Sequence, residues 1–226
     1  MHRIPIGFAP IYDVMTGPQT TTEAFTTLFS FSTLLRPGLT LTEQGFLDTL
    51  LATENIDTAG LDIWATTQNN INVAPNNERD VMPLYTDYGA DGSTLSICTN
   101  SDQDPDFDGN KPAEHRYLRV TTTSSSAYDV KVVPYPIPPP TTDTQPDPPA
   151  DPIVIRDRSD PDVFMYRNGT LVAFGNSGVD DSETFTTQVL PADTYVVDLQ
   201  EWRFGDPDKS SDYPAQVCFD VTMTAQ

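Results

Sequence analysis

The proline-rich stretch at residues 134–152 constrains this chain more than any other feature, because nine of its nineteen residues are proline. Proline has no backbone N–H donor and a nearly fixed φ, so this stretch forms neither a helix nor a central strand. We interpret it as a semi-rigid polyproline linker. The alternative is a ligand for domains that bind PxxP motifs, which is disfavoured because no basic residue flanks the prolines.

The residues after this linker, 153–226, show the pattern of a β-sandwich. Short runs rich in β-branched and aromatic residues are separated by turn residues at roughly ten-residue spacing. The Asn168-Gly169 pair predicts a type I′ turn between strands at 162–169 and 170–175. With Thr170 the same pair forms a glycosylation sequon, which we interpret as the turn alone. Three more strands are predicted at 183–190, 194–202 and 215–224.

A first, shorter β unit is predicted at 78–133. Residues 116–123 and 127–133 alternate apolar and polar side chains around three serines, which predicts a hairpin. Shorter strands are predicted within 81–89 and 93–99. A strand, a small-residue corner and a tyrosine-led strand occur here and again at 182–199. The fold predicted from these patterns is mainly β, with two jelly-roll-like β-sandwich units joined by the linker.

The residues before these strands, 1–77, are predicted to form a helical segment that packs on the first β unit. A helical hairpin is expected at 18–56, broken at Pro37-Gly38. Two pairs have the spacing of capping boxes: Thr20 with Glu23, and Thr40 with Glu43. The apolar positions that support the two helices are Phe25, Leu28, Phe29 and Leu35, then Phe46, Leu47, Leu50 and Leu51.

The net charge of −21 comes from 33 acidic and 12 basic residues. Such a chain is repelled by phosphate backbones and anionic lipid, which argues against binding to nucleic acid or to a membrane surface. No apolar run is long enough for a transmembrane segment. The charge is explained either as a solubility device in a salty or extracellular medium or, in part, as a means of holding calcium.

The first residues, MHRIPIGFAPIYDV, lack the basic start and continuous apolar run of a signal peptide. Taken literally, this favours the cytoplasm. Because the chain begins directly in an apolar segment, we expect instead a mature form or a fragment of a longer secreted precursor, located outside the cell or at its surface. Cys98 and Cys218 lie in apolar segments and are predicted as buried free thiols; the alternative is one disulfide that joins the two halves.

Residues 153–226 resemble the bacterial pre-peptidase C-terminal (PPC) domain family, and 78–133 resemble it more weakly. The resemblance includes an Asp-x-Asp pair before an apolar strand, a hairpin glycine, a strand led by glutamate and an L-x-x-G-x-Y corner. The matching residues are Asp160, Asp162, Gly169, Glu183, Leu190 and Tyr195, with Asp193 where the family has glycine. The resemblance implies a small, calcium-associated β-sandwich that follows the catalytic part of a secreted hydrolase.

Catalytic motifs are absent from the sequence. His2 and His115 are the only histidines, and no HExxH, GxSxG, CxxC or phosphate-binding glycine loop occurs. Acidic pairs of the kind used by glycosidases are unavoidable among 33 acidic residues and therefore carry no information. We predict that the chain is not an enzyme and has no catalytic residues.

Two acidic segments are candidate calcium sites. The alternating carboxylates of Asp104-Pro-Asp-Phe-Asp-Gly match the first half of an EF-hand loop, but position twelve is His115, so the EF-hand match fails. The alternative to calcium is a solvated acidic turn. The predicted ligands are Asp102, Asp104, Asp106, Asp108 and Glu114 in the first segment, and Asp157, Asp160 and Asp162 in the second.

The aromatic residues Trp202, Phe204 and Tyr213 are predicted to form a binding surface, with a lid over the core as the alternative. Together these patterns predict a non-catalytic, calcium-stabilised accessory module for binding or assembly. Its expected partner is a protein or carbohydrate surface, or another copy bound through β edges. The alternatives are the C-terminal portion of a secreted hydrolase, a structural subunit of an extracellular polymer or, more weakly, a self-contained glycosidase.

Overall fold

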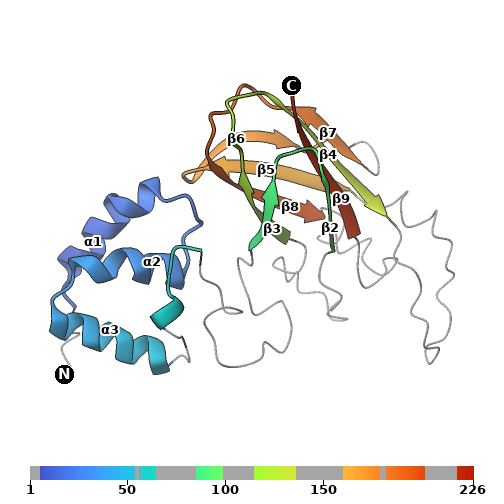
Figure 1. The fold of residues 1–226 in the computed structure, drawn as a ribbon. Helices are drawn as coiled ribbons and strands as arrows, with labels where there is room; N and C mark the ends of the chain where they lie inside the picture. Colours follow the sequence, from blue (N-terminus) through green and yellow to red (C-terminus); the bar gives the residue numbers. More distant parts are fainter. Residues whose placement is uncertain are drawn as a thin grey trace, which may run out of the picture. The chain divides into compact units, whose positions relative to one another are not determined.

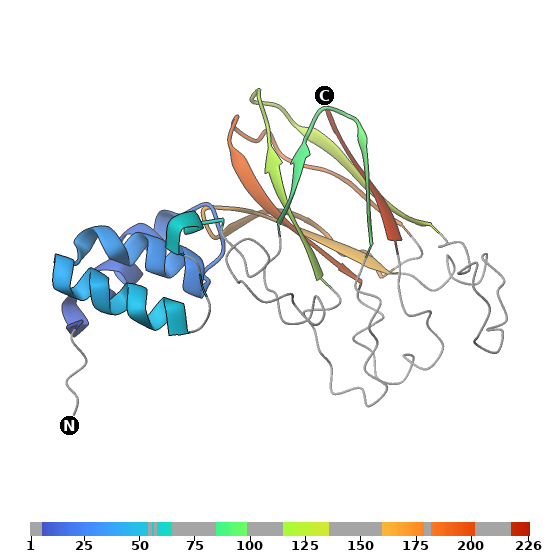
Figure 2. The ribbon, with the colours of Figure 1, turned by 60° about the horizontal axis from the view of Figure 1, so that its bottom comes forward.

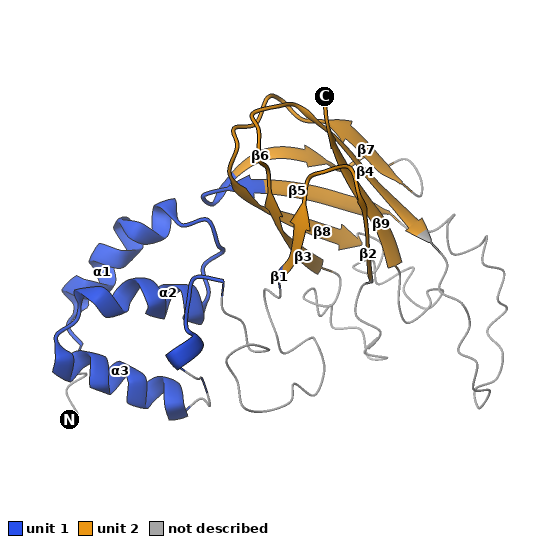
Figure 3. Ribbon diagram, viewed as in Figure 1, with its two compact units in different colours: residues 1–85, 166–170 blue, residues 86–165, 171–226 orange. Residues whose placement is uncertain are grey.

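The computed structural model describes residues 6–53, 56, 58–64, 85–98, 115–135, 160–178, 182–201 and 218–226. This part of the chain is mainly β, with two sheets and a short N-terminal helical region, as predicted (Figures 1 and 2). Contacts divide it into unit 1, Met1–Tyr85 with Tyr166–Thr170, and unit 2, Thr86–Met165 with Leu171–Gln226 (Figure 3). None of the described helices is both long and apolar enough to cross a bilayer.

The helices of unit 1 are α1 (Phe8–Thr16), α2 (Leu28–Leu35) and α3 (Leu41–Thr53), with 3₁₀ turns at Pro18–Thr21, Arg36–Gly38 and Thr58–Gly60. The capping box predicted for α3 is confirmed. The Thr40 N–H donates to Glu43 Oε2 at 2.9 Å, and the Glu43 N–H donates to Thr40 Oγ1 at 3.4 Å. Leu47 and Leu51 are the buried residues of this helix, one turn apart.

The box predicted at Thr20 and Glu23 is wrong, because α2 begins later. Thr27 caps α2, and the side chain of Ser30 takes the place of the expected glutamate by accepting from the Thr27 N–H at 2.9 Å. Helix α1 lies within the helical segment predicted at 1–77 but before the hairpin predicted at 18–56. Pro10 lies in the first turn, where a backbone N–H has no acceptor within the helix, so proline is tolerated there.

The strands are β1 (Tyr85–Gly89), β2 (Thr94–Cys98), β3 (His115–Thr121), β4 (Tyr128–Tyr135), β5 (Pro161–Arg167), β6 (Thr170–Gly175), β7 (Glu183–Thr186), β8 (Thr194–Glu201) and β9 (Cys218–Ala225). They form a five-stranded sheet in the order β1-β3-β8-β5-β6 and a four-stranded sheet in the order β2-β9-β4-β7. The core side chains come from both sheets and from both sides of the proline-rich segment.

The predicted division into two sandwiches at 78–133 and 153–226 is therefore wrong. Strand β3 pairs with β8 from His115↔Gln200 to Thr121↔Thr194, and β4 pairs with β9 from Tyr128↔Ala225 to Tyr135↔Cys218. Strands from before and after the proline-rich segment thus share each sheet. In each sheet, the two or three strands from one side of the segment would by themselves leave apolar faces in water. Pairing with strands from the other side buries these faces.

Two local predictions have different outcomes. The hairpin predicted at 116–133 is wrong, because β3 and β4 belong to different sheets. The hairpin at 162–175 is confirmed: β5 and β6 are neighbours, and Asn168 and Gly169 have φ of 47° and 72°, as a type I′ turn requires.

The predicted linker begins later than expected, since Pro134 lies in β4, beyond the segment Asp129–Val132 that pairs with β7. Residues 136–152 of the linker lie outside the described residues.

Two similar corners connect the sheets. After β3 the chain crosses to β4, and the Tyr128 hydroxyl donates to the carbonyl of Ser124 at 3.0 Å. After β7 it crosses to β8, and the Tyr195 hydroxyl donates to the carbonyl of Pro191 at 2.7 Å. Both tyrosines reach back four residues, and their exposed fractions are 1% and 0%. The similarity between 114–133 and 182–199 is therefore a pair of equivalent corners in one sandwich.

Hydrogen bonds also join the two corners to each other. The Thr122 N–H donates to the Asp193 carbonyl and the Asp193 N–H donates to Thr122 Oγ1, each at 3.0 Å. The backbone groups of Ser126 and Leu190 pair in both directions at 2.8 and 3.1 Å. The conformation of one corner is thus held by the other, although the two are far apart in sequence.

The prediction of free thiols is also wrong, because Cys218 is disulfide-bonded. The chain has one other cysteine, Cys98, which lies opposite Cys218 in the pairing of β2 with β9. The bridge therefore joins a strand before the proline-rich segment to the last strand of the chain. This was the alternative considered from the sequence, and the β2–β9 pairing supplies its geometric reason.

Candidate functional site

The buried charged side chains among the described residues are all carboxylates. They are Asp162 at the start of β5, Glu183 at the start of β7 and Glu201 at the end of β8, with exposed fractions of 9%, 4% and 0%. Burying an ionised carboxylate is costly unless hydrogen bonds or opposite charges compensate. The partners of each carboxylate therefore indicate which of them is structural.

Glu183 and Glu201 accept backbone hydrogen bonds. Glu201 Oε1 accepts from the Asp160 N–H at 2.8 Å. Glu183 Oε2 accepts from the Ser177 N–H at 2.8 Å, and its Oε1 accepts from the Thr184 N–H at 3.2 Å. Gly175 leaves space for Glu183, because a Cβ at this position would lie 2.6 Å from Glu183 Cγ. These two carboxylates have the contacts of structural acceptors at strand ends.

Asp162 differs from both. Within the described part of the chain, no hydrogen bond or ion pair reaches its carboxylate. Burial, together with the charges of Asp160 and Glu183, raises the pKa of Asp162 to about 6. At neutral pH the folded protein therefore carries a poorly compensated anion here. A proton or a bound cation would relieve this cost.

The fit of a metal ion to these side chains is partial. Calcium takes six to eight oxygen ligands, and carboxylates are its usual protein ligands. Asp160 and Asp162 are two positions apart in the sequence. Their carboxylates lie near enough for the charge of Asp160 to act on Asp162. Among the described residues, however, no group of three or more histidine, cysteine or acidic side chains is arranged to hold a metal. These residues supply part of a calcium shell and do not complete one.

The remaining predicted site residues lie outside the described residues. This applies to the calcium ligands Asp102, Asp104, Asp106, Asp108, Glu114 and Asp157, and to the aromatic residues Trp202, Phe204 and Tyr213. Trp64, which is described, is partly buried and meets the ring of Tyr85 edge-on at 5.0 Å within unit 1. Of the predicted residues, the structure describes Asp160 and Asp162, and the charges of Asp160 and Glu183 act on Asp162.

The histidine at the start of β3 has a partner that the sequence did not reveal. His115 Nδ1 lies 2.7 Å from Asp198 Oδ1, and the His115 ring stacks on Tyr117 with centroids 5.8 Å apart. An aspartate in this position fixes the ring of a histidine, as it does in many catalytic sites. No described hydroxyl or thiol group hydrogen-bonds to this ring. The strand pairing that places Asp198 beside His115 is long-range, so spacing in the sequence gave no signal for it.

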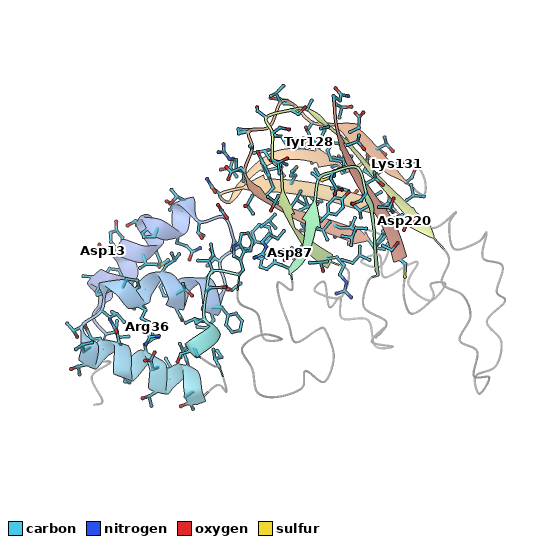
Figure 4. The ribbon with its side chains drawn as sticks, in the orientation of Figure 1. Asp13, Arg36, Asp87, Tyr128, Lys131 and Asp220 are labelled. Carbon is cyan, nitrogen blue, oxygen red and sulfur yellow. The ribbon has the colours of Figure 1, made fainter. Side chains whose placement is uncertain are left out.

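Other charged groups on the sheet surfaces are paired or exposed. Arg119 forms a bidentate pair with Asp87 of β1, and the contact from Nη2 to Oδ2 is 2.6 Å. On the four-stranded sheet, Asp220 Oδ1 accepts from Ser96 Oγ at 2.6 Å, whereas Lys131 is exposed (Figure 4). These contacts have the character of surface ion pairs and cross-strand pairs.

The space between the sheets is too small for a ligand. The void there measures about 10 Å³ and is lined by core side chains such as Leu118, Val163 and Val221. That volume is at the lower limit for one water molecule. An open hollow of about 280 Å³ in unit 1 is lined by Thr33, Arg36, Pro37, Gln44 and Leu61. Its one charged group, Arg36, is paired with Asp48 at 2.9 Å. Among the described residues, the sandwich therefore offers its outer faces and edges for binding.

No model of a protein family matches the chain, and no curated protein matches it by sequence. Among solved structures, it is similar to the crystal structure of the pre-peptidase C-terminal domain of a collagenase from Bacillus anthracis. The identity is 9% and the TM-score 0.35, over 68% of this chain and 100% of that chain. At this TM-score the similarity assigns neither family nor function, so the PPC resemblance stays a prediction.

Proposed function

We propose that this chain is a non-catalytic accessory module that acts outside the cell or at its surface, is stabilised by calcium, and serves binding or assembly. The observation that carries the proposal is Asp162, a buried carboxylate with a raised pKa beside Asp160 and Glu183. A divalent cation would turn this unfavourable group into a ligand and so couple ion binding to folding. Asp160 and Asp162 are the residues that would hold the ion.

The disulfide supports the extracellular part of the proposal. Cys218 is bonded, and such bridges persist in oxidising compartments but are rare in the cytosol. Calcium is also abundant outside cells, where sites of modest affinity are filled. The partner would be a protein or carbohydrate surface, contacted by an outer face because the sandwich interior is filled. A C-terminal portion of a secreted hydrolase remains the alternative that the PPC resemblance implies.

Calcium is expected to raise the melting temperature of the purified chain. A ligand that binds only the native state stabilises it by about 2.7 kcal/mol at a hundredfold excess over Kd. For a chain of 226 residues this corresponds to a shift of about 5–10 °C. The measurement is a thermal melt in EDTA and in millimolar calcium, with magnesium as the control ion. Equal melting temperatures in all three conditions would contradict the calcium role and leave the disulfide argument unaffected.

Three variants locate the ion. Asp162→Asn is expected to lose most of the calcium-induced shift, whereas Asp13→Asn, at an exposed position on α1, is expected to retain it. Asp106→Asn tests the other predicted segment in the same melt. If Asp106→Asn alone abolishes the shift, calcium binds at 102–114 and the assignment to Asp162 is wrong.

Replacing Asp162 by asparagine is expected to stabilise the calcium-free protein at neutral pH. The folded pKa of Asp162, about 6, lies above its ordinary value of 3.8. The protonated Asp162 carboxyl is therefore accommodated without cost below about pH 4. This stability is lost as the pH rises through about 6 and the carboxyl ionises in the folded protein. Urea denaturation in EDTA should show equal stability near pH 4 and a gain for the variant of about 1–2 kcal/mol near pH 7.5, after allowance for solvent screening.

The control for this pH profile is again Asp13→Asn. Because Asp13 is exposed, this variant should follow the wild-type profile at every pH. An Asp162→Asn variant that is less stable than wild type in EDTA at neutral pH would show that the Asp162 carboxylate is well compensated. The structural basis of the proposed ion site would then be lost.

A further inference from the structure

Strand β6 is an exposed edge of the five-stranded sheet. It spans Thr170–Gly175 and pairs on one side with β5, while no described strand pairs with its other side. The outward N–H and C=O groups of such an edge form a template on which another strand can add. The type I′ turn at Asn168-Gly169 matches the twist of the two strands that it joins. The backbone of β6 is a regular strand from Thr170 to Gly175.

Strand β6 lacks the features that protect natural sheet edges. Such edges are usually short or carry charged residues, prolines or bulges. The sequence from Asn168 to Gly178, NGTLVAFGNSG, contains neither a charge nor a proline, although the chain as a whole carries −21. The described edge strands elsewhere are shorter: β1 and β2 have five residues each and β7 has four. At six residues, β6 is the longest of these edges.

Two large apolar side chains are exposed on β6. Leu171 and Phe174 have exposed fractions of 44% and 54%. They lie three positions apart, and successive side chains of a strand point to opposite faces, so each face of the edge carries one of them. Among the described residues of unit 2, the only other exposed large apolar side chain is Val189. The exposed apolar surface of the described sandwich is therefore concentrated at this edge.

We propose that β6 pairs antiparallel with β6 of a second copy of this chain, joining two five-stranded sheets across a two-fold axis. The proposal deepens the assembly role proposed above and is independent of calcium. The edge has no carboxylate that would attract a cationic strand. An anionic strand would be repelled by the net charge of −21. The occupant that matches the edge is a neutral apolar strand, and β6 itself has this composition.

The sequence of β6 is self-complementary under this symmetry. In an antiparallel pair, residues directly opposite each other lie on the same face. With the two-fold axis at Ala173, Val172 lies opposite Phe174 of the second copy, and the symmetry repeats this pair. Leu171 then lies opposite Gly175 of the second copy. Pairs of an aromatic with a β-branched side chain are among the stabilising cross-strand combinations.

The test is sedimentation equilibrium of the full chain across a range of protein concentrations, at low and at high sodium chloride. We expect a monomer–dimer equilibrium between 24.9 kDa and twice that mass. High salt should strengthen the dimer, because it screens the repulsion between two copies that each carry −21. A wild-type chain that stays monomeric at the highest concentration and salt would overturn the proposal and leave the edge to a strand of a different protein.

Lysine substitutions assign the interface. Leu171→Lys and Phe174→Lys should each weaken the dimer about tenfold or more. The matched control is Val189→Lys, at a position 68% exposed and outside β6, which should leave the dimer unchanged. Each substitution makes the net charge less negative, so weaker association cannot result from greater repulsion.

Circular dichroism and melting temperature establish that each variant is folded. If either β6 variant unfolds, hydrogen exchange of wild type decides, because the outward amides of β6 should exchange more slowly at dimer-forming concentrations. A dimer that survives both β6 substitutions, or is equally weakened by Val189→Lys, would place the interface elsewhere.

Discussion

Removal of the disulfide at Cys218 is expected to lower the free energy of unfolding by about 2–5 kcal/mol. The bridge connects Cys218 with position 98, so it closes a loop of 218 − 98 = 120 residues. Closing so long a loop restricts the unfolded chain strongly. It also joins β2, an edge strand, to β9 in the interior of its sheet, so the edge strand should detach first when the bridge is cut.

The measurement is urea denaturation of oxidised wild type, reduced wild type and a Cys98→Ala/Cys218→Ala variant. Cys218 is 3% exposed, so alanine also creates a small cavity, and the reduced wild type separates this cavity from loss of the bridge. Reduced and oxidised protein with the same denaturation midpoint would show that the bridge does not stabilise the sandwich. Calcium-induced shifts should persist after reduction, because the proposed ion site does not include the bridge.

Truncation of Tyr195 is expected to be the most damaging single change outside the disulfide. Tyr195 is fully buried, and its hydroxyl donates to the Pro191 carbonyl at 2.7 Å. Tyr195→Phe removes this hydrogen bond and should cost about 1 kcal/mol. Tyr195→Ala also empties the core position and should cost about 3–5 kcal/mol. Tyr128→Phe should resemble Tyr195→Phe, since its hydroxyl makes the equivalent bond to Ser124 at 3.0 Å.

The control for the tyrosine series is Tyr12→Phe on α1, where the side chain is 53% exposed and the change should be within about 0.5 kcal/mol. Denaturation midpoints of wild type and of the four single variants give the comparison. Because hydrogen bonds join the two corners, the double variant Tyr128→Phe/Tyr195→Phe should differ from the sum of the single variants. Strict additivity would show that the corners form independently of each other.

The candidate site was predictable only where its residues are close in sequence. Asp160 and Asp162 are two positions apart and precede an apolar strand, so their proximity follows from the sequence. The charge of Glu183 acts on Asp162, and Gly175 leaves space for the Glu183 side chain where β7 begins. That approach depends on how the chain crosses between sheets, and no local pattern records it. The same limit applies to Asp198 beside His115.

The sequence by itself determined much of the local structure of this protein. The alternation of apolar and polar residues located the strands, Asn168-Gly169 located a hairpin turn, and Thr40 with Glu43 located the start of α3. These features depend on backbone preferences and on contacts within a few residues. The two tyrosine corners were visible as a repeated pattern for the same reason, because each tyrosine bonds to a carbonyl four residues earlier.

Only the tertiary structure decided which strands pair. The proline-rich segment made two separate sandwiches the natural reading, yet β3 pairs with β8 and β4 with β9 across that segment. A strand's own sequence specifies that one face must be buried, but not which strand will cover it. Loop-closure entropy rises only slowly with loop length, so a long intervening segment does not prevent such pairing. The disulfide between the two cysteines followed from this pairing, because β2 and β9 place positions 98 and 218 opposite each other.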